Sequence, residues 1–155
     1  MPPQPAHRIR RKPGFFHPVP VRARRDGWTV VRQCAFLAQL YLTGSVAAAA
    51  RAVGMTRESA HRLRRRDGAA SFAHQWDRVL TPPGRGHVNA AGLAKRKVTL
   101  GELNRRFEQG MVAPVIHCGR MTAIREKADN SALLEYLRRT KAIAARVERS
   151  DPGSW

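Results

Sequence analysis

The sequence has few acidic residues. It contains 11 Asp and Glu against 29 Lys and Arg, which gives a formal net charge of +18 at pH 7. Such an excess of positive charge opposes compaction and favours a polyanionic partner. The acidic residues are also not clustered, so a nuclease or hydrolase that needs paired carboxylates or a metal has no candidate ligands. We therefore expect no enzymatic activity, no catalytic residues and no cofactor.

The sequence is also poor in cysteine and has no long apolar run. Cys34 and Cys118 are too few and too far apart for a disulfide framework, and no Cys or His has a partner at zinc-ligand spacing. No stretch is apolar for long enough to cross a membrane, and the N-terminus has Pro and Arg where a signal peptide has its apolar segment. These absences predict a reduced cytoplasmic protein without a metal site or membrane partner.

Residues 1–27 combine six prolines with seven basic side chains and little apolar sequence. We expect this segment to be a disordered basic tail, because it offers little burial to offset the entropy of ordering. The pair Phe15–Phe16 is interpreted as an incidental apolar pair, with a docking point or a base-stacking element as the alternative. Deletion of the tail should weaken the binding of all nucleic acids about equally. The expected tail contacts to nucleic acid are Arg8, Arg10, Arg11, Lys12, Arg22, Arg24 and Arg25.

Residues 28–80 show four helical patterns, each preceded by a hydroxyl side chain that can cap it. The first helix follows Thr29 and ends at Gly44, a residue suited to a helix C-terminus. The other predicted helices are Val46–Val53 after Ser45, Arg57 to about Arg66 after Thr56, and Phe72–Leu80 after Ser71.

The rest of the chain has a different pattern. Residues 81–98 are interpreted as a basic Pro/Gly linker, in which Lys95, Arg96 and Lys97 could contact nucleic acid. Residues 99–149 are predicted to form a helix, a hairpin and a second helix, and 150–155 a short tail. The first helix starts with a Thr99/Glu102 capping box and ends at Gly110; the hairpin spans 112–126 with Gly119 in its turn; the last helix runs from about Ser131 to Arg149, capped by Asp129 or Asn130.

Leu133, Leu137, Thr140, Ala144 and Val147 in the last helix follow the spacing of a coiled-coil seam. Packing on the protein's own core is favoured over self-association through this region. The predicted fold class is therefore mainly α, with a helix-turn-helix domain followed by a helix, a small β-hairpin and a long C-terminal helix.

Residues 46–65 match the requirements of two helices that cross at a tight turn. Ala49 and Ala50 are small enough for close approach, and Gly54 can adopt the positive φ that the turn needs. Val53 and Met55 flank the turn, while Ala60 and Leu63 face inward from the second helix. This pattern predicts a helix-turn-helix.

The outward face of the second helix is rich in hydrogen-bond donors, as a helix in the DNA major groove requires. We expect Arg57, His61 and Arg62 at base edges. Glu58 could read cytosine N4 or pair with Arg62 one turn away, and the pair is favoured. The complete predicted DNA-binding set is Thr56, Arg57, Glu58, His61, Arg62, Arg64, Arg65 and Arg66, of which Thr56, Arg65 and Arg66 lie nearer phosphate.

Two segments resemble the family of phage small terminase subunits and related bacterial or prophage proteins. The first is WTVVRQCAFLAQLYLTGSVAAAARAVGMTRESAHRLRRRDGAASFAHQWDRVL, residues 28–80, and the second is VAPVIHCGRMTAIREKADNSALLEYLRR, residues 112–139. The resemblance implies a helix-turn-helix, an aromatic-bearing helix, a short hairpin and a last helix. It also implies recognition of viral DNA and delivery to a large terminase subunit. The chain departs from the family in its basic N-terminal segment and in the Pro/Gly-rich residues 81–87.

The leading prediction is thus a double-stranded DNA-binding protein of nucleoid, viral or prophage setting, with small-terminase-like recognition as one role. A transcriptional regulator of phage or mobile-element type is a second role. A structural or assembly protein that binds nucleic acid nonspecifically is the alternative class. The C-terminal region is nearly neutral, with five basic and four acidic residues in 129–155. It is therefore the expected place for a large terminase subunit or a second copy to bind.

Overall fold

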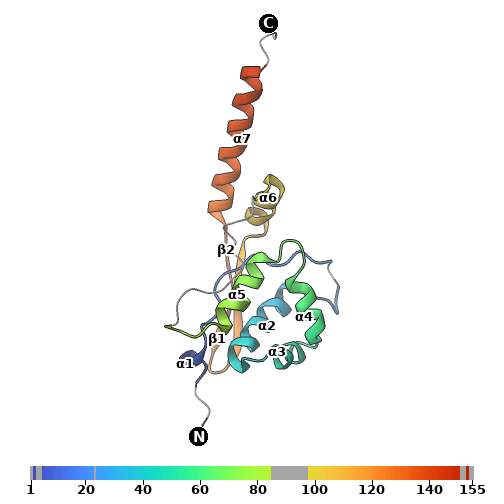
Figure 1. The fold of residues 1–155 in the computed structure, drawn as a ribbon, viewed down its shortest axis with the longest axis vertical. Helices are drawn as coiled ribbons and strands as arrows, with labels where there is room; N and C mark the ends of the chain where they lie inside the picture. Colours follow the sequence, from blue (N-terminus) through green and yellow to red (C-terminus); the bar gives the residue numbers. More distant parts are fainter. Residues whose placement is uncertain (1, 3–4, 23, 85–97, 151–152, 154–155) are drawn as a thin grey trace. The chain divides into compact units, whose positions relative to one another are not determined.

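The computed structural model describes residues 2, 5–22, 24–84, 98–150 and 153. It is mainly helical, with one two-stranded sheet, as expected (Figure 1). The chain divides into two compact units. Unit 1 contains residues 1–96 and 111–127, and unit 2 contains residues 97–110 and 128–155. The predicted linker cations Lys95, Arg96 and Lys97 lie outside the described residues.

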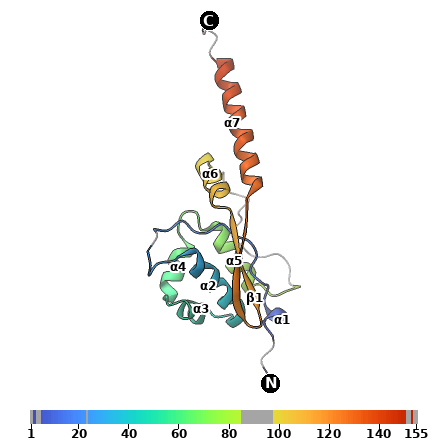
Figure 2. The same cartoon turned by 180° about the vertical axis from the view of Figure 1, so that it is seen from behind.

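Unit 1 contains a group of helices and an antiparallel hairpin, and Figure 2 shows them from behind. The hairpin was predicted, and its turn lies at Cys118–Gly119. Both strands contact the first long helix, which supplies the partner that an isolated hairpin needs. The elements of unit 1 are α1 (Ala6–Ile9), α2 (Val30–Thr43), α3 (Val46–Ala52), α4 (Arg57–Arg64), α5 (Ala70–Leu80), β1 (Met111–His117) and β2 (Arg120–Lys127).

Three of the four predicted caps in 28–80 are confirmed. The hydroxyls of Thr29, Ser45 and Thr56 each accept a hydrogen bond from the backbone N–H three residues ahead. The prediction for Ser71 is wrong, because α5 begins at Ala70, two residues before the predicted start at Phe72, and has no side-chain cap. Ser71 is buried, and its hydroxyl accepts a hydrogen bond from the backbone N–H of His17 at 2.9 Å.

That contact belongs to a larger departure from the prediction. Residues 13–21 do not form a disordered tail; they cross the core as an arm that is packed against it. Phe16 is fully buried and exchanges two backbone hydrogen bonds of 2.9 Å with Val112 of β1. Its ring meets the ring of Phe72 edge to face at 5.9 Å. Phe16 is therefore a core residue and not an incidental apolar residue.

The arm is held by buried amides on the helices beneath it. Gln33 accepts from the N–H of Val19 at 2.8 Å and donates to the carbonyls of Val19 and Trp28 at 3.1 Å. Gln75 accepts from the N–H of Gly14 at 2.8 Å. Prolines in the arm lack an N–H, so fewer backbone donors need partners. The partners come from the core, which is why a proline-rich segment can be ordered here.

Arg10 also differs from its predicted role. Its guanidinium donates to the carbonyls of Tyr41 and Leu42, in the last turn of α2. These carbonyls have no partner within their own helix, and a cation at a helix C-terminus is favourable. Gly44 follows with φ of +70°, and a Cβ there would lie 2.5 Å from an Arg10 nitrogen. Arg10 is thus a capping group for α2 and not a free nucleic-acid contact.

Unit 2 consists of α6 (Leu100–Gln109) and α7 (Asn130–Ser150). Thr99 caps α6 as predicted, accepting from the N–H of Glu102, whose carboxylate bonds to Arg106 at 2.8 Å. The helix ends at Gly110, as expected. Asp129 caps the start of α7 through the N–H of Ala132 at 3.0 Å.

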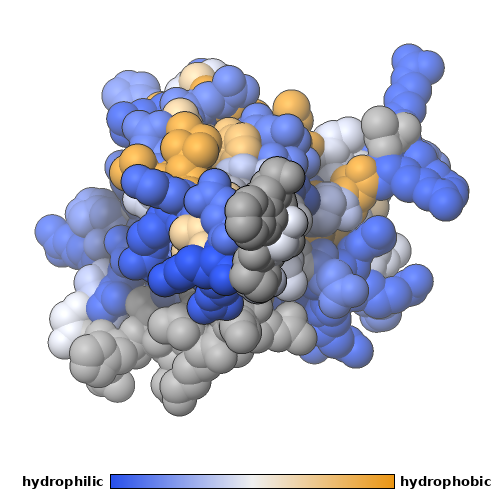
Figure 3. All heavy atoms as spheres, turned by 90° about the horizontal axis from the view of Figure 1, so that it is seen from above, coloured by the Kyte–Doolittle hydropathy of each residue, from blue (hydrophilic) through white to orange (hydrophobic). Residues whose placement is uncertain are grey.

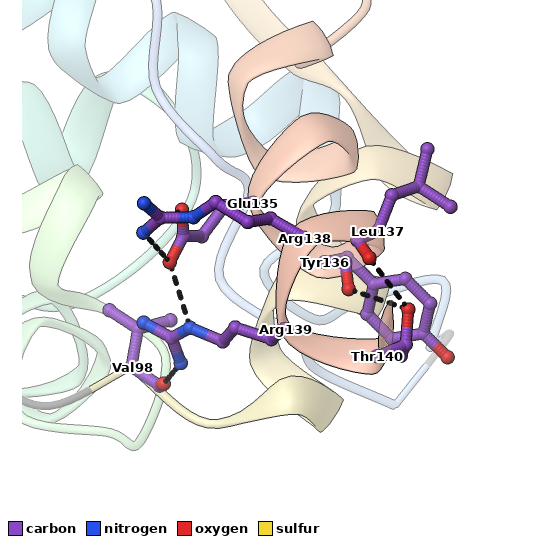
Figure 4. A network of polar contacts seen from close by, with 7 residues as sticks. All are labelled: Val98, Glu135, Tyr136, Leu137, Arg138, Arg139 and Thr140. Atoms are coloured by element: carbon purple, nitrogen blue, oxygen red, sulfur yellow. Dashed lines mark hydrogen bonds and ion pairs between the residues drawn. The ribbon is translucent and has the colours of Figure 1, made fainter. Parts of the chain in front are cut away.

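A polar network stabilises the first half of α7 (Figure 4). Glu135 forms ion pairs with Arg138 and Arg139, at 2.8 and 2.9 Å. Hydrogen bonds from Arg138 and then Arg139 lower the pKa of Glu135. Arg139 also donates to the carbonyl of Val98, which joins the start of α6 to α7. Here Phe107 packs on Tyr136, with ring centroids 5.3 Å apart.

Among the coloured residues in Figure 3, hydrophilic ones predominate, with apolar residues between them. Within the described ranges, no helix has the length and apolar character needed to span a membrane. The apolar side chains of α7 that are exposed in the single chain are Leu133, Leu134, Leu137, Ile143 and Val147. The predicted packing of the seam on the protein's own core is therefore wrong for Leu133, Leu137 and Val147.

Candidate nucleic-acid interface

The buried residues of α3 and α4 and the glycine in the turn between them agree with the sequence pattern. Ala49 and Ala60 are fully buried where the two helices meet, and Leu63 is almost completely buried. Gly54 has φ of +75°, and a Cβ built on it would meet nothing within 4 Å. Its role is therefore the left-handed backbone of the turn rather than close approach. Val53 and Met55 pack against the core from either side of the turn.

Besides this packing, three side-chain contacts fix α4 to the rest of unit 1. The indole N–H of Trp28 donates to the hydroxyl of Ser59 at 2.8 Å. The ring of His61 lies 5.2 Å from that of Trp76, measured between centroids. Arg64 reaches across to α5. A helix held on several sides can present its remaining face in one orientation, which recognition of a rigid partner requires.

That remaining face forms a shallow hollow. It is lined by Arg57, Glu58, His61, Arg62 and Arg65, all from the set predicted to bind DNA. The three arginines are exposed, and His61 is half-buried. We call these five residues the α4 face. Thr56, also exposed, caps the helix beside them through the N–H of Ser59.

Arg64 departs from the predicted DNA-binding set. Its two terminal nitrogens bond to the two carboxylate oxygens of Asp77 at 2.8 and 2.9 Å. Its guanidinium also lies 5.1 Å from the centre of the Trp76 ring. The side chain therefore ties α4 to α5, and its donors point away from the α4 face. Sequence periodicity alone placed Arg64 near the end of the outward surface, because Asp77 is remote in sequence.

We expect Arg64→Ala to reduce the free energy of unfolding by about 1–2 kcal/mol, because the half-buried Asp77 carboxylate loses both hydrogen bonds. Urea denaturation followed by circular dichroism measures the change. The double variant Arg64→Ala/Asp77→Ala removes the orphaned carboxylate and should recover part of the loss. A double variant less stable than the single one would contradict this reading of the pair.

Glu58 was expected to pair with Arg62 along the helix. Both side chains are exposed, and among the described residues no ion pair joins them. The favoured interpretation of Glu58 is therefore not confirmed. Its carboxylate lies free on the α4 face, which leaves contact with a cytosine amino group as the other interpretation.

Arg66 lies past the end of α4 and belongs to a second hollow. This hollow is lined by Val21, Arg22, Arg24, Gly27, Trp28 and Arg66. Sequence reasoning assigned Arg22 and Arg24 to a tail and Arg66 to the recognition helix. The structure brings the three together. The pattern in the sequence that could have revealed this is the polar Gln33 on an otherwise apolar helix face, since a buried amide needs partners from another segment.

The other predicted tail cations are distributed differently. Arg8, Lys12 and Arg25 are exposed, whereas Arg11 is half-buried.

Neither cysteine lies on the α4 face. Cys34 is buried in α2, and burial raises the pKa of its thiol to about 12. Cys118 is exposed in the hairpin turn, where its φ is 49°.

The arrangement can bind an extended anion, since exposed guanidinium groups line both hollows of unit 1. Comparison of the chain with protein-family models, with curated proteins and with solved structures gives no match in any of the three.

Proposed function

We propose that unit 1 binds double-stranded DNA by placing α4 in the major groove. The observation that carries this proposal is the α4 face, a single helical surface with three exposed arginines on a helix that is fixed to the core. Arginine forks can pair with the O6 and N7 atoms of guanine, and an α-helix fits the width of the major groove. The overall charge of +18 adds attraction to the phosphate backbone.

The roles of the face residues follow from their positions. Arg57 and Arg62 are the first and sixth residues of α4 and are the proposed base readers, with His61 beside them. Arg65 follows the last helical turn and is the proposed phosphate contact at that end. Arg64 has a positioning role, because it holds the helix through Asp77.

Arg62→Ala is expected to weaken binding to the preferred duplex by about 1–3 kcal/mol and to relax base preference at one position. The preferred duplex comes from selection of bound sequences out of a random pool, followed by titration. Arg120→Ala is the matched control, because this exposed arginine of β2 lies outside both hollows. If Arg57→Ala and Arg62→Ala both leave binding to every duplex unchanged, the groove-reading proposal is wrong.

A nonspecific polycation is the second candidate function, favoured by the exposed arginines that lie outside α4. It predicts equal affinity for scrambled duplexes and a steep fall of log K with log salt concentration. Specific readout predicts a preference that persists as the salt concentration rises. The same selection experiment therefore separates the two functions.

The resemblance to small terminase subunits supports viral DNA recognition as the first biological role to test, and transcriptional regulation is the competing role. A neighbouring large terminase or portal gene would favour packaging. A direct assay is co-purification of a large terminase subunit with the intact chain.

A further inference from the structure

The chain that leads from the arm to α2 is fixed by hydrogen bonds at residues 24–28. A backbone hydrogen bond of 3.1 Å from Gly27 to the carbonyl of Arg24 closes a turn. A Cβ on Gly27 would lie 3.3 Å from the Arg24 side chain, so glycine keeps this turn tight. Arg32 of α2 donates to the carbonyls of Arg25 and Gly27, at 3.1 and 2.7 Å. Trp28 then enters the core and bonds to Ser59 of α4.

This course places Arg22 and Arg24, which follow the arm, beside the end of α4. The hollow that contains Arg22, Arg24 and Arg66 has a volume of about 360 Å³. Its remaining lining is Val21, Gly27 and Trp28, so no carboxylate lines it. We call this hollow the arginine cradle. Asp26 and Asp67 adjoin it in sequence, but both are exposed and neither is part of the lining.

The chemistry of the cradle suits a phosphate group. All three arginines are exposed, and none forms an ion pair with a described residue. Guanidinium groups offer paired donors that match two phosphate oxygens. Three like charges in one hollow repel each other, and a bound anion relieves that repulsion.

The position of the cradle identifies the source of the phosphate. Arg65 lines the α4 face and the next residue, Arg66, lines the cradle, so the two surfaces adjoin at the end of the helix. A duplex whose major groove holds α4 carries its phosphates along the rim of that groove. Resting on the proposed function, we propose that the arginine cradle binds a backbone phosphate of the same DNA duplex and fixes the register of α4 along it.

The test compares Arg22→Ala/Arg24→Ala with the control Arg120→Ala/Lys141→Ala, which removes the same charge from exposed positions outside both hollows. The probes are the selected duplex and scrambled duplexes of equal length. The cradle variant should bind all duplexes about tenfold more weakly at low salt, and its slope of log K against log salt should fall by about 1. In an ethylation-interference assay, the number of phosphates whose ethylation blocks binding should fall by one. Unchanged melting of the free protein confirms that the arm still packs.

The outcomes separate the cradle from the proposed function. If the cradle variant matches its control while Arg62→Ala loses base preference, the cradle proposal is wrong and groove reading stands. If the cradle variant weakens binding while Arg57→Ala and Arg62→Ala have no effect, groove reading is wrong and this register role fails with it. Tighter binding of an RNA hairpin than of any duplex would overturn both.

Discussion

Replacing Phe16 with alanine is expected to lower the free energy of unfolding of unit 1 by about 3–5 kcal/mol. The side chain is fully buried and packs edge to face on Phe72. Removal of the side chain leaves a cavity between the arm and the helices. It also removes the packing that supports the two backbone hydrogen bonds between residue 16 and Val112. The expected loss is a large part of the 5–15 kcal/mol that stabilises a typical domain. Guanidinium or urea denaturation, followed by tryptophan fluorescence, measures it.

Phe15→Ala is the matched control. Phe15 is half-buried, and its ring lies 5.5 Å from the guanidinium of Arg125 and 4.9 Å from the ammonium of Lys127. Cation–π contacts at such sites contribute about 0.5–1 kcal/mol, so this variant should remain close to wild type. Equal stability of the two variants would show that the arm is detached from the core in solution.

The same packing changes what deletion of residues 1–27 is expected to do. For a disordered tail, deletion would weaken the binding of all nucleic acids about equally. For a packed arm, deletion removes Phe16 and Val19 from the core and uncovers Gln33 and Gln75. The truncated chain should therefore unfold at lower denaturant concentration, and any loss of DNA binding has to be judged against that loss of structure.

The second large effect is expected for Gln33→Leu, at about 3 kcal/mol of unfolding free energy. Leucine fits the apolar surroundings, yet it leaves the N–H and C=O of Val19 and the C=O of Trp28 without their partners. These groups are shielded from water, so they cannot replace a lost hydrogen bond with one to solvent. The free-energy cost of leaving them unpaired exceeds the gain from burying the leucine side chain. Thermal and urea unfolding both report the change.

Gln39→Leu provides the comparison on the same helix, because Gln39 is half-buried rather than fully buried. This variant should stay within about 0.5 kcal/mol of wild type. If Gln33→Leu were equally neutral, the amide would not be holding the arm, and the ordered course of residues 13–21 would need another cause.

Local signals in the sequence predicted much of the fold. Thr29, Ser45 and Thr56 each come just before a segment whose apolar residues repeat at helical spacing. Capping is a local contact, because the side chain bonds to a backbone N–H three residues ahead. The turn at Gly54 and the buried Ala60 and Leu63 follow from the same local pattern. The hairpin was also predictable, because its turn and strand alternation lie within one short segment.

Long-range contacts explain what the sequence did not reveal. The ordering of the arm depends on Gln33, Ser71 and Gln75, which are remote from it in sequence. Proline content and charge describe only the arm itself, so they indicated disorder. The same limitation applied to the candidate site. Arg57 and Arg62 were placed by helical periodicity, whereas the diversion of Arg64 to Asp77 depends on tertiary packing.

Unit 1 is built from two separate stretches of the chain, and this affects how the chain can fold. Its arm pairs with β1, a strand that the ribosome makes only after all the helices of unit 1 and the first helix of unit 2. Contacts that close such long loops form late and slow the overall reaction. During synthesis, Phe16 must therefore wait for Val112, and a fragment ending at residue 80 would present unpaired arm backbone. We therefore expect the segment 28–80, which contains both helices of the proposed reading motif, to be less stable on its own than within unit 1.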